Sequence, residues 1–379
     1  MSDSIALLDR LIAFPTVSHQ SNMAMIDFIR DTLDACGIDC QIITDDAGGK
    51  ANLYATIGPR DRPGVMLSGH TDVVPVKDQA WTRDPFTMSE TDSLLYGRGT
   101  TDMKGFIACA LAAAVRASDM DLKTPLHLAF SYDEEIGCVG VRRLIDVMEN
   151  APVRPRFCLI GEPTLLQVAT AHKGKVAARA NCRGVECHSA MAPMGVNAIH
   201  LAADLIAEIR AMQADIEKAG ARDGDYDIPY TTLHAGIIKG GTALNIVPNL
   251  CTLDFEIRNL AADDPEALMD DIVGRAGRLV ENIEGAAIEF ETIHRYPGLN
   301  TPPDSEVVGF VKSLTGANST TKLSFGTEGG LFDARLGIPT VVCGPGSMAQ
   351  GHKPDEFIAR SEMDACDRML DTLLEWLAD

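Results

Sequence analysis

The stretch GVMLSGHTDVVP, residues 64–75, joins an apolar run to a pair of ionisable residues. Val65, Met66 and Leu67 are typical of a buried strand, and His70 and Asp72 follow where the apolar run ends. In an extended chain, side chains two residues apart lie on the same face. The spacing therefore predicts that His70 and Asp72 face one common object at the end of a strand.

Similar apolar runs recur along the chain and alternate with helical patterns. Strands are predicted at 52–57, 64–69, 125–131, 157–161 and 339–343, with helices at 104–117, 139–149 and 361–378. Apolar residues at helical spacing also predict helix through residues 1–36. Alternation of this kind predicts an α/β domain with a largely buried sheet.

The middle of the chain has a different order of elements. Its pattern predicts a strand (175–183), a helix (195–218), two strands (231–239 and 249–258), a helix (264–282) and a strand (286–293). The order β-α-β-β-α-β is that of ferredoxin-like domains. We therefore expect one discontinuous catalytic domain, residues 1–174 and 293–379, with a second domain inserted at 175–292.

Polar residues collect where the predicted strands end. Ligands of open α/β sheets bind at the carboxyl ends of the strands, so these residues are candidates for one site. They are His70, Asp72, Glu134, Glu135, Glu162 and His352, and GRGTTDMKG (97–105) adds Asp102 directly before a helix. Two imidazoles and five carboxyl groups are thus expected at a single edge.

Each of these residues alone has an ordinary explanation. Asp102 is in a position to cap a helix, and Glu134 and Glu135 suit a solvated loop. Together, however, like charges at one edge repel each other unless a cation lies among them. Imidazole with carboxylate suits zinc, cobalt or manganese, and this many ligands suits two ions that share a carboxylate. The alternative is a set of solvated loops that splay apart.

Composition excludes several classes of function. The 379 residues include 33 basic and 54 acidic side chains, so the net charge is −21 at pH 7. This charge argues against nucleic-acid binding and against an anionic membrane surface. No apolar run is long enough to span a bilayer, and the first residues lack the features of a secretory signal. The ten cysteines show no CxxC pair, so we expect reduced thiols in a cytoplasmic protein.

Five motifs in order carry a family resemblance over nearly the whole chain: GHTDVVP, GRGTTDMKG, DEE, GEPT and GPGSMAQGHKPDEFI. Together they resemble the aminoacylase/carboxypeptidase (M20) family of di-zinc amidohydrolases. The resemblance implies a di-zinc exopeptidase-like catalytic domain with a mixed, mainly parallel sheet and an inserted ferredoxin-like dimerisation (lid) domain. GPGSMAQGHKPDEF and HAGIIKGGTALNIVPN (234–249) favour the branch that hydrolyses N2-acetyl-L-ornithine to ornithine and acetate in arginine biosynthesis.

The resemblance also implies roles for the residues at the sheet edge. His70 and Glu162 would hold one zinc, Glu135 and His352 a second, and Asp102 would bridge the two. Cobalt can substitute for zinc. Asp72 would orient the imidazole of His70, and the peptide after Asp102 would be cis. Glu134 would be the general base, although spacing alone leaves the choice between Glu134 and Glu135 open.

Further roles are implied outside the metal ligands. His188 would stabilise the oxyanion in the active site of the partner subunit of a homodimer formed through residues 175–292. Arg258 and Asn245 would bind the α-carboxylate and neighbouring groups of an N-acyl amino acid. Gly329 and Gly330 would let the backbone approach the substrate. Glu328 and Asp333 are candidates for an acidic lining that suits an ammonium group.

Three alternatives stay open at this point. The same chemistry serves other N-acyl amino acids, such as succinyl-diaminopimelate or acetylcitrulline. A dimeric homologue could keep the fold as a binding protein without catalysis, but all the expected ligands and the base are present. A two-metal phosphohydrolase would lack the Arg258 contact to a carboxylate.

Overall fold

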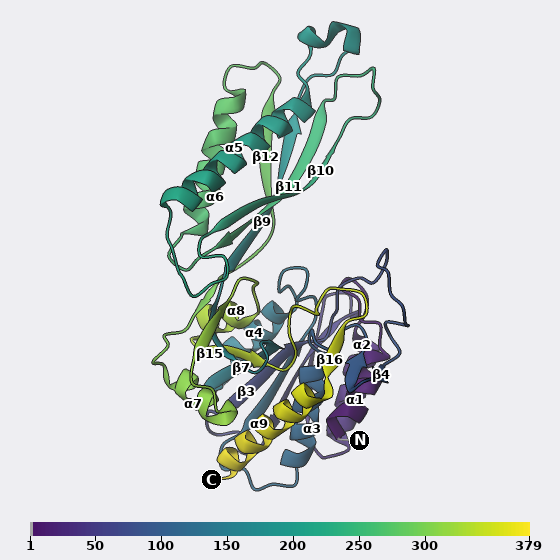
Figure 1. Cartoon of the computed structure of the whole chain (residues 1–379), viewed down its shortest axis with the longest axis vertical. Coiled ribbons are helices and arrows are strands. Elements are labelled where there is room, and N and C mark those ends of the chain that lie inside the picture. Colours follow the sequence, from purple (N-terminus) through teal and green to yellow (C-terminus); the bar gives the residue numbers. More distant parts are fainter. Residues whose placement is uncertain (1–2) are drawn as a thin grey trace. The chain divides into compact units, whose positions relative to one another are not determined.

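The computed structural model describes residues 3–379, which divide into two units (Figure 1). The first unit contains the described residues up to Ala171, together with Leu299–Lys322 and Thr327–Asp379. The second unit consists of His172–Gly298 and Leu323–Gly326. None of the helices formed by residues 3–379 is long and apolar enough to cross a membrane.

The first unit is built on a sheet to which the described residues contribute nine strands. The strands are β1 (Cys40–Thr44), β2 (Ala51–Ile57), β3 (Val65–His70), β6 (Leu126–Ser131), β7 (Phe157–Pro163), β8 (Val168–His172), β13 (Leu299–Asn300), β14 (Thr320–Leu323) and β15 (Thr340–Gly344). Their order is β1-β2-β6-β3-β7-β15-β8-β13, and β14 pairs with β8. The four central strands, β6, β3, β7 and β15, are parallel, whereas β1, β2 and β8 pair in antiparallel fashion. This mixed sheet with a parallel centre confirms the predicted fold class.

Helices cover both faces of this sheet. They are α1 (Asp3–Ile12), α2 (Met23–Asp34), α3 (Lys104–Ala117), α4 (Val141–Glu149), α7 (Glu306–Thr315), α8 (Gly329–Leu336) and α9 (Arg360–Ala378). One apolar core joins α1, α2, α3, α7 and α9 to the sheet, while α4 and α8 pack together on the other face (Figure 1). Successive side chains of β2 point to opposite faces of the sheet. Leu53 enters the apolar core, whereas the side chain of Asn52 donates to the carbonyl of Gly140, next to α4. The helix α3 is largely buried and mostly apolar, since it lies between the sheet and the helices α1, α2 and α9.

The continuous helix predicted for residues 1–36 is wrong. Two helices, α1 and α2, are separated by residues 13–22, and residues 1 and 2 lie outside the described part of the chain. Pro15 has no N–H to donate and disfavours helix before it. The side chain of Asn22 instead exchanges hydrogen bonds with the backbone of Ala51. The break therefore attaches this segment to the main sheet.

The second unit contains an antiparallel sheet of four strands in the described chain, in the order β10-β11-β9-β12. Its elements are β9 (Gly174–Arg183), the 3-10 helix η1 (Ser189–Met194), α5 (Ala198–Ala219), β10 (Thr232–Gly240), β11 (Leu250–Asn259), α6 (Pro265–Val280) and β12 (Ala287–Tyr296). Alternate residues of β11, from Cys251 to Ile257, are buried in a core shared with α5 and α6. The order of elements matches the predicted β-α-β-β-α-β pattern.

A small antiparallel sheet completes the first unit. Strand β5 (Leu94–Tyr96) pairs with β4 (Ser89–Thr91) and with β16 (Phe357–Ala359). Phe357 lies opposite Tyr96, so the segment that follows β5 meets the segment that precedes β16. Asp102 belongs to the first of these segments and His352 to the second.

Candidate active site

The candidate site lies at the carboxyl ends of the central parallel strands. His70 is the last residue of β3, opposite Ser131 at the end of β6, and Glu162 lies near the end of β7. The loop after β6 carries Glu134 and Glu135, and the loop after β15 carries His352. Parallel pairing thus brings together side chains that are far apart in the sequence.

His70, Asp102 and Glu162 form one buried group of potential metal ligands. The Nε2 atom of His70 is 3.1 Å from Oδ1 of Asp102 and 3.4 Å from Oε1 of Glu162. An imidazole nitrogen and carboxylate oxygens at this spacing have the chemistry of a zinc, cobalt or manganese site.

Asp102, Glu135 and His352 form a second group. Nε2 of His352 is 3.1 Å from Oδ2 of Asp102 and 3.1 Å from Oε2 of Glu135. The two oxygens of Asp102 therefore face different histidines, one in each group. This is the geometry that a carboxylate bridging two cations requires. The donor atoms of each group all lie within 4.8 Å of one another, so the residues fit two metal ions.

The carboxylates of this cluster favour the protonated form of both imidazoles. Burial lowers the pKa of His70, but the carboxylates of Asp102, Asp72 and Glu162 outweigh this effect and raise it well above its usual value. Contacts with Asp102 and Glu135 raise the pKa of His352 to about 11. Burial raises the pKa of Glu135 to about 7. Divalent cations bound among these groups would supply positive charge to the carboxylates.

Asp72 connects the end of β3 to the loop that carries the two glutamates. Its carboxylate accepts hydrogen bonds from the backbone N–H of Glu134 at 3.0 Å and from Oγ of Ser18 at 2.7 Å. The sequence predicts a contact between this carboxylate and His70. In the structure, Nδ1 of His70 is 2.9 Å from the backbone carbonyl oxygen of Asp72 and 3.6 Å from the carboxylate. The carbonyl is thus the closer partner of His70, and the carboxylate also positions Glu134.

Glu134 is buried next to the first group but belongs to neither group. Burial raises its pKa well above the usual value, and the negative charges of Glu162, Glu135 and Glu328 add to this. The thiol of Cys138 donates to Oε1 of Glu134 at 3.3 Å. Glu134 is therefore a carboxyl group with a high proton affinity beside the candidate ligands, which suits proton transfer.

The peptide between Asp102 and Met103 is cis, as predicted. Met103 is buried, and its Sδ accepts from the backbone N–H of His70 at 3.3 Å. The helix α3 begins directly afterwards, at Lys104.

Gly329 and Gly330 are buried at the start of α8 in the first unit. A Cβ at Gly329 would come within 3.2 Å of Thr327 and Thr340, so the backbone is closely surrounded here. The neighbouring Glu328 is buried and accepts a hydrogen bond from Ser131 Oγ, whereas Asp333 is exposed.

The other predicted residues belong to the second unit. His188 is exposed at the start of η1, and its Nδ1 accepts from the backbone N–H of Ala190 at 3.1 Å. Asn245 is also exposed, and its carbonyl accepts from the N–H of Ser189 at 3.0 Å. These two residues therefore lie on one loop cluster.

Arg258 lies on β11 in the second unit and is half-buried. Its guanidinium donates to Glu256 at 3.0 Å and to the hydroxyl of Tyr296 at 3.0 Å. Glu256 in turn forms an ion pair with Lys175 at 3.0 Å. The expected carboxylate-binding group is thus already held by a carboxylate of its own unit.

Several residues that contact the site were not predicted from the sequence. Ser18 donates a hydrogen bond to Asp72, and Cys138 donates one to Glu134. Glu356 forms a buried ion pair with Arg98 and accepts from the backbone N–H of Asp102. Arg98 occurs in the same motif as Asp102, and Glu356 in the same motif as His352. This closeness in sequence was the signal that could have identified them. Nothing in the local sequence marks Ser18 or Cys138.

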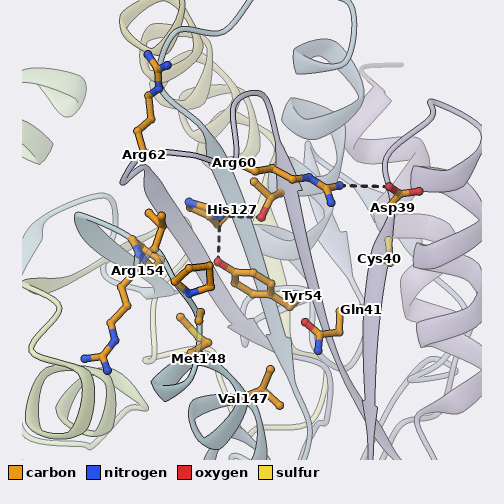
Figure 2. Close-up of a pocket in the computed structure, with 15 residues that line it drawn as sticks. Asp39, Cys40, Gln41, Tyr54, Arg60, Arg62, His127, Val147, Met148 and Arg154 are labelled. Atoms are coloured by element: carbon orange, nitrogen blue, oxygen red, sulfur yellow. Dashed lines mark hydrogen bonds and ion pairs between the residues drawn. The ribbon is translucent and has the colours of Figure 1, made fainter.

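A cavity of about 310 Å³ elsewhere in the first unit holds none of the candidate ligands. It is lined by strands β1, β2 and β6 and by residues 147–155. His127 on its wall contacts the hydroxyls of Tyr54 and Thr56, both at 3.0 Å (Figure 2). Figure 2 shows the side chains of its arginines pointing in different directions, with Arg60 paired to Asp39. The cavity therefore lacks a convergent set of charged groups.

Known proteins resemble this chain over nearly its full length. Residues 66–376 match the model of Peptidase family M20/M25/M40. A Proteus mirabilis (strain HI4320) protein named acetylornithine deacetylase is 35% identical, covering 98% of this chain and 96% of that relative. A Myxococcus xanthus protein of the same name is also 35% identical, covering 98% and 97%.

The fold is also found in solved structures. An M20 family metallo-carboxypeptidase from Sulfolobus solfataricus superposes with a TM-score of 0.80 at 19% identity, covering 100% of both chains. The chain therefore belongs to Peptidase family M20/M25/M40, and it is a metal-binding hydrolase that acts on amide bonds.

Proposed function

We propose that this protein hydrolyses N2-acetyl-L-ornithine to L-ornithine and acetate, a step of arginine biosynthesis. The observation that carries the chemistry is the pair of ligand groups that share Asp102, with the buried Glu134 beside them. The choice of substrate is supported by relatives of that name at about 35% identity over nearly the whole chain.

Two divalent cations, zinc by preference and cobalt as a substitute, would be held by the two groups. His70 and Glu162 would bind one ion, Glu135 and His352 the other, and Asp102 both. When bound, the metals would acidify a water molecule and polarise the scissile carbonyl. Asp72 would hold the neighbouring loop in place through its hydrogen bond from Glu134.

Glu134 would move the proton. In its ionised form it accepts a proton from the attacking water, and it then delivers this proton to the amine that leaves. Its neighbour Glu135 contacts His352 and is therefore assigned as a ligand rather than as the base.

The second unit would supply the substrate contacts. His188, from the partner subunit, would donate a hydrogen bond to the developing oxyanion, and Arg258 and Asn245 would bind the α-carboxylate and its surroundings. Arg258 would then exchange part of its contact with Glu256 for the substrate. The backbone at Gly329 and Gly330 would contact the substrate from the first unit.

A homodimer would form through the second unit, residues 175–292. Strand β10 is an edge strand, and Ile237 and Ile238 on it are 51% and 48% exposed. The loop after it exposes Leu244 completely and Ile246 by 41%. An unpaired edge with exposed apolar side chains is suited to pairing with a second copy of the chain.

A panel of N-acyl amino acids, assayed with Zn²⁺ or Co²⁺, tests the proposed substrate. We expect the highest kcat/KM for N2-acetyl-L-ornithine, ahead of N-succinyl-diaminopimelate and N-acetylcitrulline. A higher kcat/KM for either of these two would show that it is the preferred substrate, and the proposed amide hydrolysis would still hold. Absence of hydrolysis across the panel, with metals bound, would favour the binding homologue instead.

A further inference from the structure

The strongest unassigned feature of the first unit is a buried ion pair beside the two ligand groups. Nη1 of Arg98 lies 2.6 Å from Oε2 of Glu356, and both side chains are 1% exposed. Strands β5 and β16 pair directly next to these residues, and the backbone N–H of Gly97 donates to the carbonyl of Glu356 at 3.0 Å. Burial of two charges is costly unless their hydrogen bonds are satisfied, so the other contacts of the pair are informative.

The carboxylate of Glu356 holds the backbone of the shared ligand. Its Oε1 accepts from the N–H of Thr101 at 3.0 Å and from that of Asp102 at 3.1 Å. One oxygen thus binds two consecutive amides while the other binds Arg98. The Asp102 carboxylate is consequently fixed from its backbone side.

The guanidinium of Arg98 holds the loop that carries His352. Nη1 donates to the carbonyl of Lys353 at 3.2 Å, and Nη2 donates to Oε1 of Gln79 at 2.6 Å. Nε2 of Gln79 then donates to the carbonyl of His352 at 3.0 Å. The Nε atom of Arg98 has no hydrogen-bond partner among the described residues, so the guanidinium binds through its two terminal nitrogens.

The position of His352 depends on these hydrogen bonds to its loop. Its φ of +62° is in the left-handed region, which costs energy for a residue with a side chain, and its side chain is 49% exposed. Neither local conformation nor burial therefore fixes the imidazole. The contacts to the carbonyls of His352 and Lys353 hold the backbone from which the imidazole projects.

We propose that Arg98, Glu356 and Gln79 are positioning residues that set the spacing between Asp102 and His352, and thereby the affinity for the second of two metal ions. The inference rests on the proposed function, since it requires two ions per chain. His70 and Glu162 have no contact with Arg98, Glu356 or Gln79 among the described interactions, so the first ion should depend on these residues much less.

Calorimetric titration of the metal-free protein with Co²⁺ tests this. We expect two ions per chain for the wild type, and about 10–100-fold weaker binding of one ion in Glu356→Gln and Arg98→Lys. The other ion, which shares Asp102 but not His352, should lose much less affinity. Gln79→Glu keeps an acceptor for Arg98 and loses the donor to His352, so it should also weaken one ion only. Arg335→Gln, which removes an ion pair between α8 and α4, is the matched control and should bind both ions as the wild type does.

The double variant Arg98→Met/Glu356→Met guards against misfolding, because it leaves neither charge buried alone. If this variant is folded by circular dichroism and still binds two ions with wild-type affinity, the inference is wrong. If both ions bind equally weakly and the thermal stability also falls, the three residues have a general structural role. This outcome would also overturn the inference. A wild type that binds fewer than two ions would instead refute the dinuclear site of the proposed function.

Discussion

Asp102 belongs to both candidate ligand groups. One of its carboxylate oxygens faces His70 and the other His352, and its backbone N–H is bound by Glu356. The sequence placed Asp102 before a helix and grouped it with the histidines, because residues at strand ends gather at one edge of an α/β sheet. Its contact with Glu356 was not predicted, because it depends on the pairing of β5 with β16, although Glu356 lies in a motif beside His352.

Glu134 and Glu135 are adjacent in sequence but should respond differently to the same substitution. Glu134→Gln removes the proton acceptor and should lower kcat by about 10²–10⁴-fold while the metal content stays at two ions. Glu135→Gln removes a ligand contact to His352 and should lower the metal content itself. Steady-state kinetics with elemental analysis of each variant distinguishes the two roles. Near-normal turnover in Glu134→Gln would exclude it as the base.

Glu328 should make the stability of the metal-free protein depend on pH. Burial raises its pKa to about 7, whereas an unfolded glutamate titrates near pH 4.3. The folded state therefore holds the proton more tightly, so the stability that this group contributes is complete below about pH 4 and is lost as the pH rises through 7. Glu328→Gln keeps the acceptor for Ser131 and should raise the free energy of unfolding at pH 8 by roughly 2–4 kcal/mol relative to the wild type.

Urea unfolding of wild type and Glu328→Gln at pH 5 and pH 8 measures this difference. The two curves should lie closer together at pH 5 than at pH 8. A gap that does not change with pH would contradict the assignment of this carboxyl group.

At the scale of elements, β7 and α3 pack closely next to Glu162, one of the candidate ligands. A Cβ added to Gly161 would lie 1.9 Å from Cδ1 of Phe106, a residue of α3, and Gly161 directly precedes Glu162. Only glycine allows the strand and helix to approach this closely. The position of Glu162 therefore depends on a residue without a side chain.

Gly161→Ala should destabilise the protein by about 1–3 kcal/mol or more, because α3 must shift away from β7. Gly309→Ala in α7 is the control, since nothing lies within 4 Å of its Cβ, and alanine should be neutral or stabilising there by up to about 1 kcal/mol. Thermal unfolding of both variants measures the difference. Equal Tm values would show that α3 and β7 can separate without cost.

The elements that the sequence predicted correctly are those with strong periodicity. The runs that became β2, β3 and β7 are apolar and bounded by turns, and β9 to β12 alternate with amphipathic helices. The short strands β8, β13 and β14 were not predicted, because their pairing is defined by neighbours distant in the chain. The helix predicted across residues 13–22 failed because tertiary hydrogen bonds of Asn22 and the geometry of Pro15 outweigh apolar periodicity.

For the whole molecule, self-association should depend on β10. Ile238→Glu places a charge on its exposed edge and should shift a homodimer towards monomer, as measured by analytical ultracentrifugation. Val273→Glu is the control, because Val273 is 44% exposed on α6, which packs against β12 and β9. A dimer that resists Ile238→Glu but dissociates with Val273→Glu would move the interface to the helical face.

The unequal exposure of the two histidines has a kinetic consequence. His70 is 1% exposed, whereas the side chain of His352 is 49% exposed. A competing chelator can reach the outer position without opening the core, so the two ions should leave at different rates and a protein with a single ion should accumulate between them. Stopped-flow removal of Co²⁺ by dipicolinate should show two phases of equal amplitude, and a single phase would mean that both positions exchange through one opening event. Loss of the ion at the outer position should then lower the activity while the fold persists.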